Sequence, residues 1–364
     1  MQQSSNFQSI VLVVFGFFAV GAVLAFSGLI PVLNNREGVV SGDVVIWGTI
    51  KESAISPVLN EIIKGNDGLN LKYIEKSKES FDQDFIEALA SGKGPDIIFL
   101  SQDLIIKHQD KIAKIPYETI SERSFKNTYI EEGEIYLTEN GILGLPVFVD
   151  PMVMYWNRDI FSSSGVANPP LYWDEFPLLV PKITKKDGAS NIIQSTISFG
   201  EFKNVSNAKD ILAMLMMQVG SKLVEIDKET GKPRPTFADT LSNSINPGEV
   251  SLRFFTEFSD PAKPTYSWNK SLPNSRDSFT SGRLAVYLGY SSEILSIRAK
   301  NPHLNFDVVP VPQPRGSKLK INFGRINALA VTKASRNISG AFYVASALAD
   351  KDLSQNLSSN LYLS

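Results

Sequence analysis

The chain has 364 residues, 43% of them hydrophobic, and its 36 basic and 38 acidic side chains leave a net charge of −2. This length favours two lobes or domains over one small core. The near-neutral charge, without a long basic run, argues against nucleic acid and anionic membrane surfaces as main partners. Because the sequence contains no cysteine, disulfides, Cys-ligated zinc, thiol catalysis and a cysteine-linked lipid anchor are excluded.

An uncharged apolar segment occupies residues 10–33. About two dozen residues, at about 1.5 Å each in a helix, would span a bilayer, so we predict a transmembrane anchor there. A cleavable signal peptide is the alternative, because Ala25 and Ser27 are small and spaced like a cleavage site. Residues 1–9 carry no Lys or Arg, and the apolar run continues past Ser27, which favours the uncleaved anchor. We expect residues 34–42 to be a tether and the folded part to be extracytoplasmic.

The next segment alternates strand and helix patterns. Compact β-rich runs at residues 43–48, 69–75 and 95–100 predict three strands. Apolar residues at helical spacing between them, such as Ile55 with Leu59 and Phe81 with Phe85, predict two helices. The order β-α-β-α-β with short connections predicts a largely parallel sheet covered by helices on both faces.

Ligands of such sheets bind beyond the carboxyl ends of the strands. Residues 47–49 and 100–103 are the two such ends in this chain, and polar groups follow both. These two stretches are therefore candidate ligand contacts.

Residues 139–161 read ENGILGLPVFVDPMVMYWNRDIF and form the segment in which we expect the chain to change lobes. After an Asn-Gly turn, the run VFVDPMVMYW is too apolar and β-branched for an exposed loop, which predicts a buried segment. Its one acid, Asp150, precedes a proline. Asp150 either caps a bend or faces a polar cavity.

The remaining chain predicts a second set of helices and strands. A helix follows residue 157, another begins near Trp173, and residues 207–220 form a strongly apolar helix with three methionines. Residues 223–237 form a hairpin or long loop. Further strands are expected at residues 192–200, 284–290, 306–314 and 324–333, and helices near 250–260, 291–300 and 338–350. His108 and His303 have no motif around them, so we expect both to be surface or loop residues.

With these pieces in order, the sequence resembles the extracellular solute-binding proteins, family 1, the maltose-binding-protein type that serves ABC importers. The segments that carry the resemblance are, in order, DVVIWG followed by a helix, GKGPDIIFL, GILGLPVFVDPMVMYWNRDIF, the PP-x-YWDEF turn, AKDILAMLMMQVG, SFTSGRLAVYLGYSSEI, FDVVPVPQP, and GRINALAVTK followed by a helix. They cover residues 43–364.

The resemblance implies an α/β, two-lobed periplasmic-binding-protein-like fold of type II, closing on its ligand by hinge motion. It places the first lobe at residues 43–147 and 322–350 and the second at 148–321. Residues 351–364 would begin a C-terminal region that is shorter than the resemblance implies. The expected molecule is a monomer that needs no cofactor or metal.

The resemblance also implies which residues contact the ligand. It assigns polar contacts to the loop after the first strand, a hydroxyl-binding role to Asp150, and aromatic stacking to the pair Gly289 and Tyr290. Leu100 replaces the stacking aromatic that is often found at its position, and Trp173 belongs to a turn that is usually structural. The full set of implied ligand residues is Trp47, Gly48, Thr49, Lys51, Glu52, Asp103, Phe148, Asp150, Phe199, Gly289 and Tyr290.

The expected function is capture of a small polar solute, a sugar or oligosaccharide, and its delivery to an ABC permease in the membrane. Two alternatives remain open. One is a sensor or scaffold that uses the same fold without transport. The other is an extracytoplasmic glycan hydrolase with Asp150 and either Glu201 or Glu52 as an acid pair, although the sequence contains no nucleophile elbow or metal motif.

Overall fold

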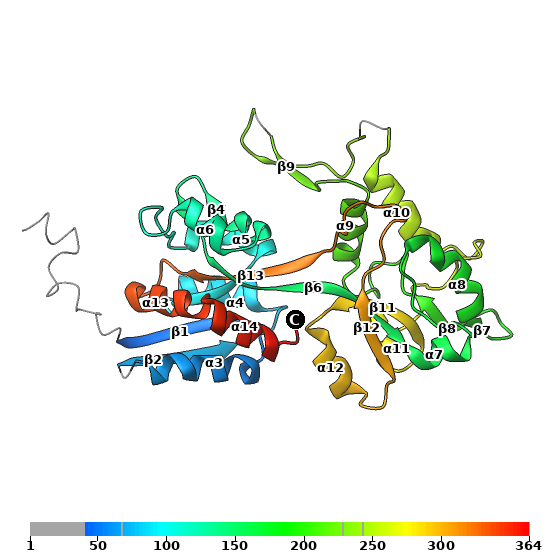
Figure 1. The fold of residues 1–364 in the computed structure, drawn as a ribbon, viewed down its shortest axis with the longest axis horizontal. Coiled ribbons are helices and arrows are strands. Elements are labelled where there is room, and N and C mark those ends of the chain that lie inside the picture. The colour runs from blue at the N-terminus through cyan, green and yellow to red at the C-terminus, as the bar shows by residue number, and fades with distance from the viewer. Residues whose placement is uncertain (1–40, 67, 228, 242–243, 364) are drawn as a thin grey trace, which may run out of the picture.

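The computed structural model describes residues 41–66, 68–227, 229–241 and 244–363. Two α/β lobes lie side by side along the long axis of the molecule, and two extended segments join them (Figure 1). The anchor predicted at residues 10–33 lies outside the described residues. Within the described ranges, no helix is long and apolar enough to cross a membrane.

The first lobe begins with the predicted β-α-β-α-β unit. Strand β1 (Gly42–Gly48) pairs in parallel with β2 (Leu69–Glu75) and β3 (Ile97–Ser101). Helices α3 (Glu52–Lys64) and α4 (Phe81–Ala90) make the two connections. The five predicted elements are therefore confirmed. In both helices, apolar residues at helical spacing, such as Ile55 with Leu59 and Phe81 with Phe85, form the buried face.

Strand β13 (Gly324–Val331) completes this part of the sheet and runs antiparallel to β3. Within this lobe the sheet is therefore parallel only over β2, β1 and β3. The C-terminal helices α13 (Ile338–Leu348) and α14 (Lys351–Asn360) pack near α3 on one side of it (Figure 1). The other elements of this lobe are η1 (Gln102–Leu104), α5 (Ile105–His108), η2 (Gln109–Lys111), α6 (Glu122–Thr128), η3 (Glu131–Tyr136), β4 (Leu137–Thr138) and β5 (Gly141–Ile142).

Strand β6 (Leu145–Asn157) belongs to both lobes. Up to Pro151 it pairs with β13, and from Met152 onward it pairs with β11 (Leu284–Tyr290) and β12 (Phe306–Pro310). The change of partner falls at a proline, which has no N–H to donate, so the ladder loses no backbone bond there. β6 lies within residues 139–161, the segment in which the sequence predicts the change of lobe.

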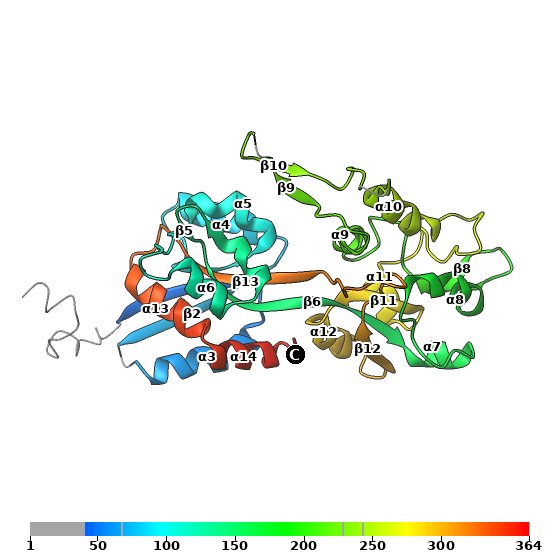
Figure 2. The same cartoon turned by 45° about the horizontal axis from the view of Figure 1, so that its top comes forward.

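The second lobe continues the sheet in the order β6-β11-β8-β7, with β12 also paired to β6. Strand β8 (Ile192–Ile197) runs parallel to β11 and antiparallel to β7 (Lys185–Lys186). The helices of this lobe are α7 (Arg158–Ser163), η4 (Trp173–Glu175), α8 (Phe176–Ile183), α9 (Ala208–Gln218), α10 (Pro247–Glu257), α11 (Ser275–Thr280) and α12 (Glu293–Lys300). Strands β9 (Val224–Ile226) and β10 (Pro233–Pro235) form the predicted hairpin, which projects from the lobe (Figure 2).

Each lobe has its own apolar core. One cluster of buried residues runs from Val44 to Val147 and resumes from Ile326 to Leu361. The other runs from Met152 to Val311. Trp173 is 6% exposed within the second cluster, and its indole N–H donates to Gln218 (2.6 Å), so its predicted structural role is confirmed.

His108 departs from the sequence-based expectation. It is fully buried, its ring meets Phe85 edge-on at 5.1 Å, and its Nε2 lies 2.8 Å from a carboxylate oxygen of Asp82. Burial lowers the pKa of His108, while Asp82 opposes this shift. The prediction of a surface residue is wrong here because α5 is short and packs this ring onto α4. His303 is exposed, as predicted.

Candidate ligand-binding site

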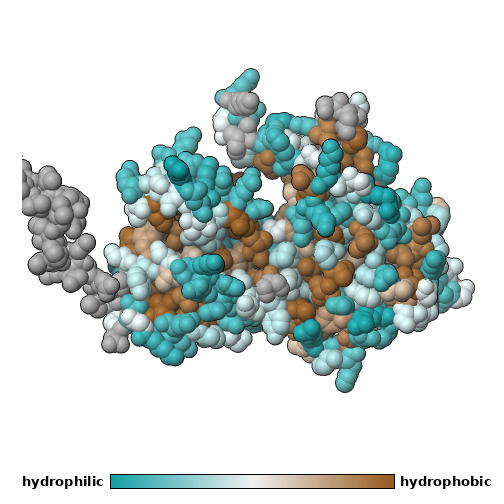
Figure 3. Space-filling view, viewed as in Figure 1, coloured by the Kyte–Doolittle hydropathy of each residue, from teal (hydrophilic) through white to brown (hydrophobic). Residues whose placement is uncertain are grey.

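A cavity of about 1200 Å³ lies between the two lobes. The first lobe contributes the start of α3 and the ends of β1 and β3, the second lobe contributes α12, and residues 359–363 close one side. Strands β6 and β13 form its base. The surface is notched where the lobes meet (Figure 3). The described ranges contain no group of three or more His, Asp or Glu side chains that could hold a metal ion.

The carboxyl ends of β1 and β3 reach this cavity, as expected for a parallel sheet. Thr49, Lys51 and Asp103 all line it. The ammonium of Lys51 lies 2.5 Å from a carboxylate oxygen of Glu75, and the backbone N–H of Glu52 donates to the other oxygen at 2.9 Å. The side chain of Glu52 does not line the cavity, so the structure brings together three of these four predicted residues.

Trp47 and Gly48 lie beneath the cavity and do not line it. Trp47 is 7% exposed, with the ammonium of Lys76 4.0 Å from its ring centroid. A Cβ at Gly48 would come within 2.7 Å of both the Phe99 ring and the Tyr73 hydroxyl. Both residues therefore support the strand end. The prediction that Trp47 and Gly48 contact the ligand is therefore corrected: neither residue lines the cavity.

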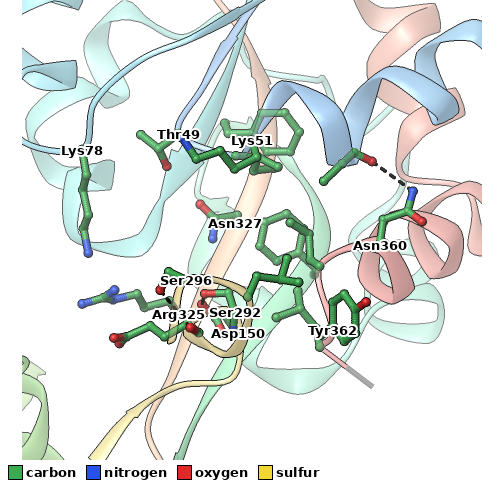
Figure 4. Close-up of a pocket in the computed structure, with 18 of the residues that line it drawn as sticks. Thr49, Lys51, Lys78, Asp150, Ser292, Ser296, Arg325, Asn327, Asn360 and Tyr362 are labelled. Atoms are coloured by element: carbon green, nitrogen blue, oxygen red, sulfur yellow. Dashed lines mark hydrogen bonds between the residues drawn. The ribbon is translucent and has the colours of Figure 1, made fainter. Parts of the chain in front are cut away.

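The base of the cavity combines aromatic and polar side chains from the two crossing strands. Phe148 and Asp150 come from β6, and Arg325 and Asn327 come from β13. Asp150, Arg325 and Asn327 are labelled in Figure 4. The Phe148 ring lies 6.2 Å from that of Phe99. Asn327 makes no side-chain hydrogen bond within the described part of the chain, so its amide is available to a ligand.

Asp150 links the base of the cavity to the second lobe. It is 8% exposed and accepts hydrogen bonds from the backbone N–H (3.1 Å) and hydroxyl (2.6 Å) of Ser292, just before α12. Burial raises the pKa of Asp150, and the two Ser292 hydrogen bonds oppose that shift. Asp150 therefore satisfies a backbone donor and also lines the cavity, so it combines the two alternatives drawn from the sequence.

The raised pKa of Asp150 gives a pH-dependent prediction. A carboxyl with a raised pKa in the folded state adds stability below its usual pKa and loses that stability as pH rises through the folded pKa. Asn at this position can hydrogen-bond Ser292 without carrying charge. We expect the melting temperature of the unsubstituted chain to fall relative to that of Asp150→Asn as the pH rises above about 4, the usual pKa of an aspartate. If the melting temperatures of the two proteins change in parallel as the pH rises, the pKa of Asp150 does not change on folding and the prediction is wrong.

Gly289 and Tyr290 do not form a stacking surface. A Cβ at Gly289 would lie 2.5 Å from the Tyr287 ring. Tyr290 is fully buried, donates its hydroxyl hydrogen bond to Asp210 (2.5 Å), and carries the Arg325 guanidinium 3.6 Å above its ring centroid. The predicted stacking role is corrected: Tyr290 supports Arg325, and Arg325 is the residue that reaches the cavity.

Phe199 does not line the cavity. Phe202, three residues later, was not predicted from the sequence but lines a second, smaller cavity. Phe199 is 1% exposed and lies in the core, 5.9 Å from Trp173. Gly200 then turns the chain with a φ of +95°, where a Cβ would come within 2.4 Å of Ser259. Beyond this turn Phe202 is 69% exposed. A second aromatic just past a strand-ending glycine was the available sequence signal.

This smaller cavity has a volume of about 410 Å³ and adjoins the larger one, with which it shares Lys78, Asp103 and Arg325. Phe202 and the start of α9 line it from the second lobe. Gln102 holds its base by donating to the carbonyl of Gly324 (3.0 Å) and accepting from the N–H of Ile326. The two cavities therefore form one cleft.

Comparison with known proteins identifies the family. The sequence model described as bacterial extracellular solute-binding protein matches residues 48–351. The chain belongs to this family. A Brucella abortus protein described as a binding protein is 21% identical to this solute-binding protein, and the match covers 86% of this chain and 73% of the relative.

Solved structures show that the solute-binding protein has the fold of oligosaccharide-binding components of ABC transporters. The GacH receptor of Streptomyces glaucescens, solved unliganded and with acarbose, matches with a TM-score of 0.67 at 15% identity, covering 89% of this chain and 79% of that one. A Listeria monocytogenes protein in complex with cycloalternan matches at 0.68, with 14% identity and 88% and 79% coverage. The maltose/maltodextrin-binding domain of Bdellovibrio bacteriovorus, bound to maltotriose, matches at 0.66, with 12% identity and 88% and 80% coverage.

Proposed function

We propose that this solute-binding protein binds a sugar or oligosaccharide between its lobes and delivers it to an ABC permease. The observation that carries the proposal is the interlobe cleft, whose larger cavity of about 1200 Å³ combines aromatic rings with available polar groups. The structures of similar fold that contain acarbose, cycloalternan and maltotriose support the same class of ligand.

The side chains of the cleft are suited to the two kinds of surface that a sugar presents, its hydroxyl groups and its apolar faces. The carboxylates of Asp103 and Asp150 can accept hydrogen bonds from hydroxyl groups, and the Asn327 amide can both donate and accept them. The rings of Phe148 and Phe202 can cover the apolar faces of the sugar, one from the base and one from the second lobe. Thr49 and Lys51 extend the polar rim. We propose these residues as the ligand set, in place of the larger set drawn from the sequence.

The proposal includes closure of the two lobes around the solute. It also includes residues 10–33 as a membrane anchor that keeps the folded part, a monomer, near the permease. Binding is favoured over hydrolysis because neither Glu52 nor Glu201, the acids considered as partners of Asp150, lines the cleft. Co-purification of permease subunits with the full chain would distinguish transport from a sensor role.

A thermal-shift screen with sugars, sugar acids and polyols tests the proposed function. A ligand that binds only the folded state stabilises it by about 2.7 kcal/mol at 100 times its Kd, which raises the melting temperature. Asn327→Ala is a suitable control, because the Asn327 amide makes no hydrogen bond to any residue that the structure describes. We expect this variant to melt like the parent without sugar and to show a smaller shift with it. If no compound shifts the parent chain, the sugar proposal is wrong.

A further inference from the structure

Lys78 is a cation of the cleft without a carboxylate partner. It lies between β2 and α4 and lines both cavities, and no described residue makes a hydrogen bond or ion pair with its side chain. The other cations lining the cleft each have a carboxylate oxygen within 4 Å: Lys51 with Glu75, Lys209 and Arg325 with Asp210, and Lys300 with Asp277. Lys78 is the exception among the described cations of the cleft.

A second cation, Arg325, lies where the end of Lys78 points (Figure 4). Its guanidinium carbon lies 3.6 Å from the centroid of the Tyr290 ring, and its Nη2 donates to Asp210 (2.8 Å) and to Asn207 (3.3 Å). Its Nε and Nη1 donate to no described residue. Lys78 is exposed to solvent, but partial desolvation in the cleft, and then the positive charge of Arg325, lower its pKa. The two cations therefore approach closely enough to repel each other.

The carboxylates of Asp103, Asp210 and Glu293 favour the charged form of Lys78, but none of them forms an ion pair with it. Asp210 already accepts from Tyr290 and Arg325, and Asp103 accepts a 2.5 Å hydrogen bond from Ser101 while lying beyond ion-pair distance of Lys78. Taken together, the smaller cavity is lined by three cations (Lys78, Lys209, Arg325) and two carboxylates (Asp103, Asp210), an excess of one positive charge. A neutral sugar would leave that excess in place.

We propose that the solute is an acidic saccharide whose anionic group binds between Lys78 and Arg325 in the smaller cavity. This inference rests on the proposed sugar-binding function and adds a charge requirement to it. A carboxylate or a sulfate group has the required chemistry, because its oxygens can accept from an unused N–H of the Arg325 guanidinium and from the Lys78 ammonium at once. Phe202, on the rim of the same cavity, is then placed against the ring that carries the acid.

Calorimetric titration of the full chain, purified in detergent, tests this inference. The panel consists of di- and trisaccharides in which each neutral member has a uronic-acid counterpart and a sulfated counterpart. We expect one acidic class to bind at least about tenfold more tightly than its neutral counterpart. That preference should shrink as salt is raised, because ions screen the attraction. If the uronic acids bind more tightly than the sulfated saccharides, the anionic group is a carboxylate; the reverse order identifies a sulfate.

Lys78→Gln then tests the residue. We expect it to reduce the preference for the acidic member about tenfold and to change the affinity for the neutral member little. Lys72→Gln is the matched control, because Lys72 is an exposed lysine of the same lobe that lines neither cavity. It should leave both affinities unchanged.

Three outcomes would overturn the inference. If neutral members bind as tightly as their acidic counterparts, the anionic requirement is wrong, while the sugar-binding function stands. If Lys78→Gln weakens neutral and acidic members equally, Lys78 binds hydroxyl groups and not an anion. If no member binds, the inference fails together with the proposed function on which it rests.

Discussion

Phe199→Ala is expected to lower the free energy of unfolding of the second lobe by about 3–5 kcal/mol, the usual cost of removing a buried phenylalanine ring. The Phe199 ring lies 5.0 Å from Phe255, 5.5 Å from Phe258 and 5.9 Å from Trp173, all within the core. Alanine would leave a cavity in the core, and the surrounding rings could fill it only by moving from their packed positions. Denaturant unfolding of the variant and the parent measures the effect.

Phe202→Ala is the matched control, with the opposite expected profile. Phe202 is 69% exposed, so its loss should change the free energy of unfolding by no more than about 0.5 kcal/mol. It should weaken sugar binding about two- to tenfold, since a ring contact is worth about 0.5–1.5 kcal/mol. A stable Phe199→Ala that fails to bind, or an unstable Phe202→Ala, would reverse the assignment of the two rings.

Arg325→Met is expected to cost about 3 kcal/mol of folding free energy, because it leaves the carboxylate of Asp210 buried without its closest cation. Asp210 is 5% exposed and lies 2.8 Å from the Arg325 guanidinium. Methionine keeps most of the aliphatic volume, so the loss reports mainly on charge. Thermal or denaturant unfolding measures it. Sugar binding should also weaken, since Arg325 lines both cavities.

The double variant Arg325→Met/Asp210→Asn separates these two effects. With the carboxylate replaced by an amide, no buried charge is left unpaired, and the oxygen of that amide can still accept from the Tyr290 hydroxyl. We expect most of the stability to return while binding stays weak. Lys209→Met should have little effect, because Lys209 is 73% exposed and 3.7 Å from Asp210. A double variant as unstable as Arg325→Met would show that the arginine stabilises by packing alone.

Local patterning was enough to predict the elements that build the cleft. The three parallel strands and their helices follow from short β-rich runs and helical spacing, and the positions of Thr49, Lys51 and Asp103 follow from where those strands end. β6 was predictable as a buried segment because its run is too apolar and β-branched for an exposed loop. Each of these features is encoded within about ten neighbouring residues.

The side chains that face the ligand were less predictable, because they depend on contacts between distant segments. Whether Phe199 or Phe202 faces the core is decided by the turn at Gly200 against Ser259, 59 positions away in the sequence. Tyr290 is removed from the cleft by Arg325 and Asp210, which come from two other elements. No sequence pattern joins these residues.

The same limit explains His108 and Lys78. His108 is buried because α5 packs against α4, where Asp82 meets its ring nitrogen. Lys78 has the appearance of an ordinary loop lysine in the sequence, and only the position of Arg325 across the cleft gives it significance. Resemblance to a family supplied the architecture, while the charges of the cleft came from the structure.

A sugar that binds between the two lobes should draw them together. The absence of native cysteine allows a clean test by paired spin labels at Glu61→Cys on α3 and Arg298→Cys on α12, exposed positions on the helices that flank the cleft. The distance between the labels, measured by pulsed electron paramagnetic resonance with and without a sugar that raises the melting temperature, should shorten on binding. An unchanged distance at a saturating concentration of that sugar would contradict the account.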